Sequence, residues 1–205
     1  MIGIYNYTVV LTYISYFAGF FGIYFAIHDH PTAAILCLMF CGVCDMFDGK
    51  IARTKKNKTE EEKKFGIQID SLCDLVCFGI LPVFIGYAIG MQELYYVPIL
   101  LFFPLAALIR LAYFNVKEFD RVKTEDKDLI FCIGLPVTPV AILLPVIYLA
   151  RTFLDHFFVF VFAAVLLVIS ILFLVPFKLK KFTTKKLLIL IGIGLICTIV
   201  MWVFR

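Results

Sequence analysis

Apolar blocks about as long as a bilayer is thick recur along most of this 205-residue chain. An α-helix needs about 20 residues to cross the hydrocarbon region of a membrane. Seven blocks approach that length, and they cover residues 7–27, 32–52, 67–90, 95–115, 134–150, 156–176 and 187–204. Hydrophobic residues make up 63% of the chain, whereas a soluble domain is typically about half apolar. The sequence therefore predicts an all-α, polytopic bundle of about seven transmembrane helices, in a single integral-membrane domain over residues 1–205.

Basic residues predict how this bundle is oriented. Of the 19 Lys and Arg residues, six lie in 53–64, four in 117–127 and five in 178–186. These segments follow the second, fourth and sixth predicted helices, so all three lie on one side of the membrane. The positive-inside rule makes that side cytoplasmic. We therefore expect a multi-pass protein of the cell membrane whose basic face meets membrane lipids. Because topology explains these charges, we expect no nucleic-acid partner.

The seven cysteines do not form a recognisable metal or disulfide pattern. Cys41 and Cys44 make a C-x-x-C, but a zinc site would need a second pair at ligand spacing. Six of the seven lie inside apolar blocks, where cysteine behaves as a small hydrophobic residue. We expect these residues to pack between helices.

Four aspartates lie within two consecutive apolar blocks. Asp45 and Asp48 are three residues apart near the end of the second block, and Asp70 and Asp74 are four apart early in the third. Both spacings place the pair on one face of a helix. Because the two helices are antiparallel neighbours joined on the cytoplasmic side, their acidic faces can meet at a similar depth.

These acids need a compensating positive charge. Ionisable groups within membrane spans are costly and are functional by default. Lys50 and Arg53 do not share the acidic stripes, because they point elsewhere by helical phase or lie a turn away. Ligation by oxygen alone favours a hard divalent ion such as Mg²⁺ or Mn²⁺. The stretch 44–78 therefore predicts a metal site on the second and third helices.

Small residues and one arginine accompany the acids. Gly49, Ala52 and Gly66 would let a phosphate-bearing ligand approach the backbone, or would serve helix packing instead. Arg53 stands two turns after Asp45, where it could meet a diphosphate or a lipid phosphate. Thr59, followed by a glutamate three residues later, forms a capping-box pattern, which predicts that the third helix begins there, in the cytosol.

The pattern Asp45-x2-Asp48-Gly49-x2-Ala52-Arg53, followed by Gly66-x3-Asp70-x3-Asp74, resembles the signature of the CDP-alcohol phosphotransferases. In one respect the chain differs: twelve residues separate Arg53 from Gly66, where the family pattern has about eight. Further segments resemble the phosphatidylserine synthase branch of that family, namely 65–79, 110–116, 134–136 and the pair Leu11-Thr12. Tyr113 stands where that branch often has a second arginine.

The resemblance implies an enzyme that uses two divalent metal ions, Mg²⁺ or Mn²⁺. Asp45 and Asp70 would bridge both ions, Asp48 would complete one site and Asp74 would contact the other. Asp74 would also be the general base that takes the proton from the acceptor hydroxyl. The implied donor is CDP-diacylglycerol and the implied acceptor is L-serine, which would give phosphatidylserine and CMP. A homodimer is common in the family.

Six residues are the implied substrate contacts: Thr12, Gly49, Ala52, Arg53, Gly66 and Arg110. Arg110 is assigned to the carboxylate of serine because it is the only arginine deep in an apolar block. Its alternative role is that of a snorkelling anchor at the membrane interface.

Three other functions stay open at this point. A sister enzyme using glycerol 3-phosphate or an inositol phosphate would need additional basic residues near the metals. A transporter usually has broken helices and a site at the membrane midplane. A lipid-binding protein without catalysis would have no need for four acids in register.

Overall fold

The computed structural model describes residues 3–52, 54–55, 59–124, 131–154, 157–176 and 178–180. Its helices are α1 (Tyr7–Ile27), α2 (Pro31–Ala52), α3 (Glu60–Asp74), the π-helical η1 (Leu75–Ile80), α4 (Leu81–Ile89), the 3-10 turn η2 (Leu94–Tyr96), α5 (Val97–Thr124), α6 (Val140–Leu149), α7 (Arg151–Leu154) and α8 (Phe158–Leu174). Two three-residue strands, β1 (Phe131–Ile133) and β2 (Lys178–Lys180), pair antiparallel. The predicted all-α class is confirmed, and this short pair is the one addition in the described residues.

Helices α1 and α3 each begin at a residue whose side chain caps the helix. The side chain of Asn6 accepts a hydrogen bond from the backbone N–H of Thr8 at 3.1 Å and so caps α1. Thr59 and Glu62 form the predicted capping box, in which each side chain binds the backbone N–H of the other residue at 3.1 Å. These bonds satisfy N–H groups that have no partner inside the helix. The predicted start of the third helix at Thr59 is therefore confirmed.

A single helical rod runs from Glu60 to Ile89 and includes a π-helical turn. The turn, η1, follows Asp74 directly, and Pro82 lies at the start of α4 behind it. Proline has no backbone N–H and clashes with the preceding turn of a regular α-helix. A π-turn changes the hydrogen-bond pattern at that point, so the rod continues past Pro82 without a break.

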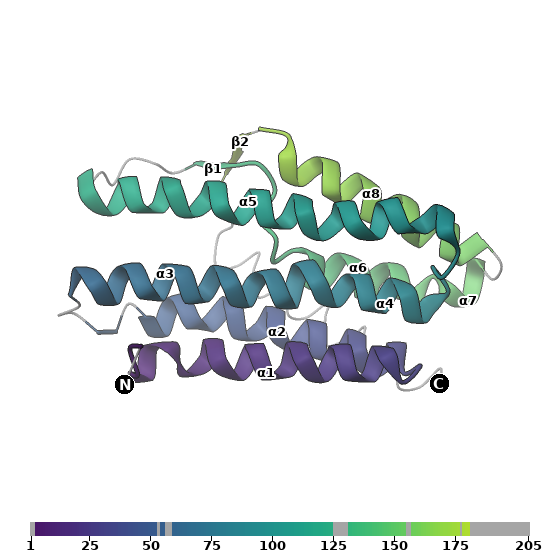
Figure 1. The fold of residues 1–205 in the computed structure, drawn as a ribbon, viewed down its shortest axis with the longest axis horizontal. Coiled ribbons are helices and arrows are strands. Elements are labelled where there is room, and N and C mark those ends of the chain that lie inside the picture. Colours follow the sequence, from purple (N-terminus) through teal and green to yellow (C-terminus); the bar gives the residue numbers. More distant parts are fainter. Residues whose placement is uncertain are drawn as a thin grey trace.

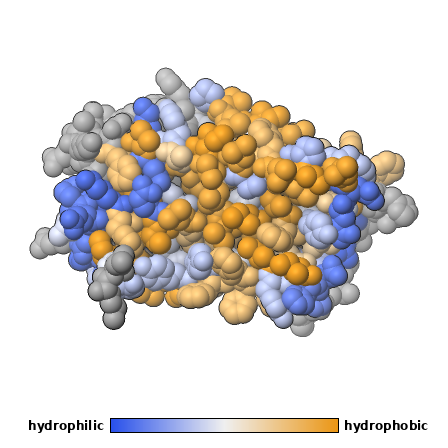
Figure 2. Space-filling view, viewed as in Figure 1, coloured by the Kyte–Doolittle hydropathy of each residue, from blue (hydrophilic) through white to orange (hydrophobic). Residues whose placement is uncertain are grey.

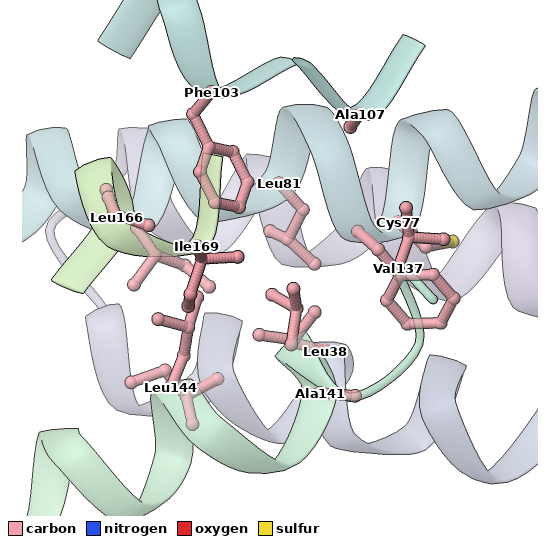
Figure 3. Packing of buried hydrophobic residues seen from close by; sticks show 14 of the residues in the cluster. Leu38, Cys77, Leu81, Phe103, Ala107, Val137, Ala141, Leu144, Leu166 and Ile169 are labelled. Atoms are coloured by element: carbon pink, nitrogen blue, oxygen red, sulfur yellow. The ribbon is translucent and has the colours of Figure 1, made fainter. Parts of the chain in front are cut away.

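The helices lie side by side along one long axis (Figure 1). Helices α1 and α2 form an antiparallel pair beside the α3–α4 rod, and α5 runs back along that rod, with α8 packed against it. Buried apolar side chains from α2, α4, α5, α6 and α8 meet in one core, where Leu38, Leu81, Phe103, Leu144 and Leu166 are fully or almost fully buried (Figure 3).

On the face shown in Figure 2, hydrophobic residues cover the middle of the molecule as a band, and hydrophilic residues gather toward both ends of the long axis. Within the described part of the chain, four helical segments are long and apolar enough to cross a membrane: Val10–Ile27, Pro31–Ile51, Glu60–Ile89 and Leu94–Phe119. They correspond to the first four predicted spans. The chain is thus a multi-pass membrane protein, as the sequence predicts.

The fifth predicted span, 134–150, is a continuous helix only in its second half. Helix α6 covers Val140–Leu149, and residues 134–139 are irregular. Gly134 has φ +78°, and Pro136 and Pro139 supply no backbone N–H, so this stretch cannot continue a helix. The sixth predicted span contains α8, whereas the seventh, 187–204, lies outside the described residues.

Candidate metal centre

Two helices bring the four aspartates together in the half of the bundle where α2 ends and α3 begins. Asp45 and Asp48 lie on the last two turns of α2, and Asp70 and Asp74 lie on the last two turns of α3. One carboxylate oxygen each from Asp45, Asp70 and Asp74 lies within 4.8 Å of the others. Three acids from two helices therefore share one small volume.

Asp48 joins this group through Asp70. Its side chain is 8% exposed and lies beside the carboxyl group of Asp70. Two negative carboxylates at close range in a buried site repel each other. A cation between them would offset that repulsion.

The donor set fits a hard divalent cation. Mg²⁺ binds oxygen ligands at about 2.0–2.1 Å in octahedral geometry, so opposite ligands of one ion lie about 4.2 Å apart. The three oxygens lie within 4.8 Å of one another, so rotation of the carboxylates could bring them to the shorter separations of ligands around one ion. All three side chains are only partly buried, which leaves room for further ligands from water or substrate.

Gly49 and Gly66 face open space. A Cβ added at either position would meet nothing within 4 Å among the described residues. By contrast, a Cβ on Gly42 would lie 2.5 Å from the Cβ of Ala141, so that glycine is required for helix packing. Packing therefore does not explain Gly49 or Gly66, and a ligand can approach the backbone at both positions. Ala52 ends α2, and Arg53 lies outside the described residues.

Thr12 is buried at 4% exposure on the face of α1 that meets α3. Its backbone carbonyl accepts a hydrogen bond from the thiol of Cys73 at 3.3 Å. Because Cys73 precedes Asp74, this bond places Thr12 at the depth of the acid group. The thiols of Cys41 and Cys77 donate in the same way to the carbonyl of Ser15, both at 3.4 Å. These cysteines are free thiols that pack between helices, as expected.

Arg110 lies slightly deeper in the bundle than the acids. Two contacts give the antiparallel register of α5 against the α3–α4 rod. Ser71 donates to Asn115 at 2.6 Å, and a Cβ on Gly79 would lie 3.3 Å from the Cβ of Ala107. This register puts Arg110 opposite residue 76, about 3 Å beyond Asp74 at 1.5 Å per residue. Arg110 is 7% exposed, and its Nε donates to the carbonyl of Leu135 at 2.9 Å.

Thr138 lies near the acids, although the sequence marked it only as part of an irregular start to the fifth helix and not as a site residue. Its hydroxyl lies within reach of the carboxylate of Asp45 as a hydrogen-bond donor. It stands in the irregular segment before α6, where no helical period indicates which way a side chain points. Pro136 and Pro139 mark the irregular backbone around Thr138. They do not reveal that Thr138 contacts α2.

The fold and this site define a class: multi-pass helical membrane proteins with an acidic cluster, able to hold a divalent metal, near one end of the bundle. The chain belongs to the CDP-alcohol phosphatidyltransferase family, whose profile matches residues 5–176.

Curated relatives carry a common name, CDP-diacylglycerol–serine O-phosphatidyltransferase. The protein from Saccharomyces cerevisiae is 34% identical over 151 residues, which are 69% of this chain and 53% of the relative. The protein from Mycobacterium leprae is 36% identical over 107 residues, 51% of this chain and 34% of the relative. The protein from Helicobacter pylori strain J99 is 30% identical over 145 residues, 68% and 56% of the two chains. The chain thus spans about a third to just over half of the length of these relatives.

Proposed function

We propose that this chain transfers the phosphatidyl group from CDP-diacylglycerol to L-serine, giving phosphatidylserine and CMP. The observation that carries the proposal is the grouping of Asp45, Asp70 and Asp74 on two membrane helices. The name shared by the curated relatives supports the choice of donor and acceptor. Membership of the family supports the reaction class.

The four aspartates would hold two divalent ions, Mg²⁺ or Mn²⁺. In this assignment Asp45 and Asp70 contact both ions, while Asp48 and Asp74 each contact one. The contact between Asp48 and Asp70 supports a second ion beside the one that the three grouped oxygens could hold. When bound, the ions supply positive charge that neutralises the donor diphosphate and the leaving CMP.

Asp74 would accept the proton in the reaction. The hydroxyl oxygen of serine attacks the phosphorus that carries the diacylglycerol, and the bond from this phosphorus to the CMP oxygen breaks. The proton of the hydroxyl passes to a carboxylate oxygen of Asp74. Asp74 is the deepest acid of α3, one turn beyond Asp70, so its carboxylate faces the side from which a small acceptor would meet the lipid-linked phosphorus.

The donor would lie across the cytoplasmic end of the site. Open space beside Gly49 and Gly66 supports close approach of the nucleotide to α2 and α3. Ala52, which ends α2, and Arg53, which lies outside the described residues, are assigned to the cytidine by resemblance to the family, and Thr12 lies at the depth of the acids on α1. The apolar tails of the donor would stay in the bilayer.

Arg110 is the residue we assign to the serine carboxylate. It is buried, it lies about one half-turn deeper than Asp74, and its Nε is fixed by the carbonyl of Leu135. This bond would hold the plane of the guanidinium in a set direction, which suits recognition of a planar carboxylate.

The proposal also covers location and assembly. The chain would lie in the cell membrane as one domain, with the metal centre at the cytoplasmic face. The basic segments at 53–64 and 117–127 support that side, because the loop after α2 and the end of α5 lie at the same end of the bundle (Figure 1). We include a homodimer in the proposal because the chain resembles a family in which homodimers are common.

Release of CMP from CDP-diacylglycerol by the purified protein tests the proposal. We expect release in the presence of Mg²⁺ or Mn²⁺ and L-serine, with phosphatidylserine as the lipid product. A panel of acceptors separates the alternatives. Release with glycerol 3-phosphate or an inositol phosphate, but not with serine, would replace the acceptor and keep the reaction class. No release with any acceptor would contradict the proposed function.

A further inference from the structure

The segment from Gly134 to Pro139 runs past the metal centre in a fixed irregular conformation. The carbonyl of Leu135 accepts the hydrogen bond from Arg110 on α5. A Cβ on Gly134 would lie 3.3 Å from the backbone oxygen of Val175, so the backbone is closely packed there. Val137 is 4% exposed and belongs to the core (Figure 3). Irregular backbone at membrane depth is tolerated where protein covers it, and here it is covered on several sides.

This segment brings one hydroxyl group to the metal centre. Ala141, three residues after Thr138, packs against Gly42, three residues before Asp45, and the hydroxyl of Thr138 lies within reach of the Asp45 carboxylate as a hydrogen-bond donor. The backbone around Thr138 is also fixed, because its carbonyl accepts a hydrogen bond from the N–H of Ala141 at 3.0 Å. The hydroxyl therefore reaches α2 from a turn that cannot shift easily.

We propose that Thr138 is a positioning residue that orients Asp45 for metal binding. The last torsion of an aspartate side chain is broad, so the carboxylate can turn unless a partner holds it. A hydrogen bond from Thr138 to one oxygen of Asp45 leaves the other oxygen directed toward Asp70 and Asp74. Hydrogen bonds to the ligands of a metal commonly set its affinity in this way. This inference rests on the proposed metal centre.

The test compares three variants by their affinity for Mn²⁺ alone, without substrate. Thr138→Val removes the hydroxyl and keeps the shape of the side chain, whereas Thr138→Ser keeps the hydroxyl. Thr32→Val is the matched control, because Thr32 also has a hydrogen-bonded hydroxyl, 2.9 Å from that of Tyr148, but stands at the start of α2, away from the acids. Free Mn²⁺ is measured by electron paramagnetic resonance during titration of each purified protein in detergent.

We expect Thr138→Val to weaken Mn²⁺ binding by about 10- to 100-fold, and Thr138→Ser and Thr32→Val to stay within a few-fold of the parent. A folded Thr138→Val protein that binds Mn²⁺ like the parent would overturn the inference. If Thr138→Val does not fold, Thr138→Ala is titrated with Mn²⁺ in its place, and its affinity is judged in the same way. A melting temperature that falls with unchanged Mn²⁺ affinity would show a structural role alone and would also overturn it.

The Asp45→Asn variant distinguishes the two proposals. If it binds Mn²⁺ as tightly as the parent, the metal centre itself is wrong, and the role of Thr138 is lost with it. If it binds Mn²⁺ poorly while Thr138→Val binds normally, the proposed function stands and only the positioning role is wrong.

Discussion

At the scale of single residues, the proposed role of Asp74 as general base can be separated from metal binding. Loss of a general base typically lowers the rate about 10²- to 10⁴-fold. Asp74→Asn should therefore reduce CMP release with saturating serine by that range, while CDP-diacylglycerol binding is largely kept by the remaining acids. Both quantities are measured on the same purified variant. Loss of donor binding together with turnover would make Asp74 chiefly a metal ligand, and turnover within a few-fold of the parent would move the base to another group.

Asp45 and Asp70 should instead be indispensable for metal binding. Each contributes an oxygen to the three-acid group, so Asp45→Asn or Asp70→Asn should abolish activity and Mn²⁺ binding without unfolding the chain. Asp29→Asn is a matched control, because Asp29 is exposed in the turn after α1 and its φ of 58° is a conformation that asparagine adopts readily. Full activity in excess chelator would contradict the metal-dependent reaction.

The acid group could be predicted from the sequence because its members lie on two helices that follow one another. Spacings of three and four residues fix a common face within each helix, and a short connection makes the helices antiparallel neighbours. The contact between Asp45 and Thr138 could not be predicted in this way. It joins residues far apart in the chain, and the irregular backbone at Thr138 gives no period from which its direction follows.

At the scale of helices, two glycines of α2 should respond in opposite ways to the same change. Gly42→Ala should lower the melting temperature, because its Cβ would lie 2.5 Å from that of Ala141 on α6. Gly49→Ala meets no described neighbour, and alanine favours a helix by up to about 1 kcal/mol over glycine, so its melting temperature should be equal or higher.

Kinetics complete this comparison. If the donor approaches the backbone at Gly49, the added methyl group should raise KM for CDP-diacylglycerol and leave the fold intact. Unchanged kinetics in a stable Gly49→Ala protein would remove this glycine from the donor site. The Gly42→Ala protein reports how far a packing defect alone changes the same constants.

The capping box at the start of α3 gives a local prediction. Thr59→Ala removes the acceptor for the N–H of Glu62, and loss of such a cap costs about 0.5–2 kcal/mol. Hydrogen exchange over residues 60–63 should become faster, with little change in α5. Thr59→Ser keeps the oxygen and is the control. Equal exchange in the alanine and serine variants would mean that other contacts hold this end, such as those of Glu62 with Lys55 and Asn6.

Periodicity and composition predicted the long helices well, whereas the irregular start of the 134–150 block was predicted by its glycine and prolines and not by its hydropathy. The block 134–150 is apolar throughout, and its hydropathy does not distinguish helix from covered irregular chain. Gly134, Pro136 and Pro139 do mark the irregular half, because each disfavours continued helical hydrogen bonding. The π-turn before Pro82 is a different case, since a proline in an apolar run does not reveal whether the helix bends, breaks or adjusts its hydrogen bonds.

At the scale of the whole molecule, the acid group and the basic segments occupy related positions. The acids lie toward the end of the bundle where α2 finishes and α3 begins, and the basic residues of 53–64 belong to the connection between these helices and to the start of α3. A soluble nucleotide can reach this end from water, while the lipid tails of a donor remain beside the hydrophobic band (Figure 2). One surface can thus serve a water-soluble leaving group, a small acceptor and a lipid product.

The orientation of this end decides which compartment supplies the acceptor, and it can be measured in intact cells. Thr54 is exposed in the connection after α2, and Lys123 is in the last turn of α5, whereas Asp29 is exposed at the opposite end. Cysteines placed at Thr54 or Lys123 should resist a membrane-impermeant thiol reagent until the cells are opened. A cysteine at Asp29 should react at once.

Labelling of the parent protein measures the background from its native thiols, of which Cys41, Cys44, Cys73 and Cys77 are buried. Labelling of Thr54→Cys or Lys123→Cys from outside would reverse the topology and place the proposed metal centre on the outer face.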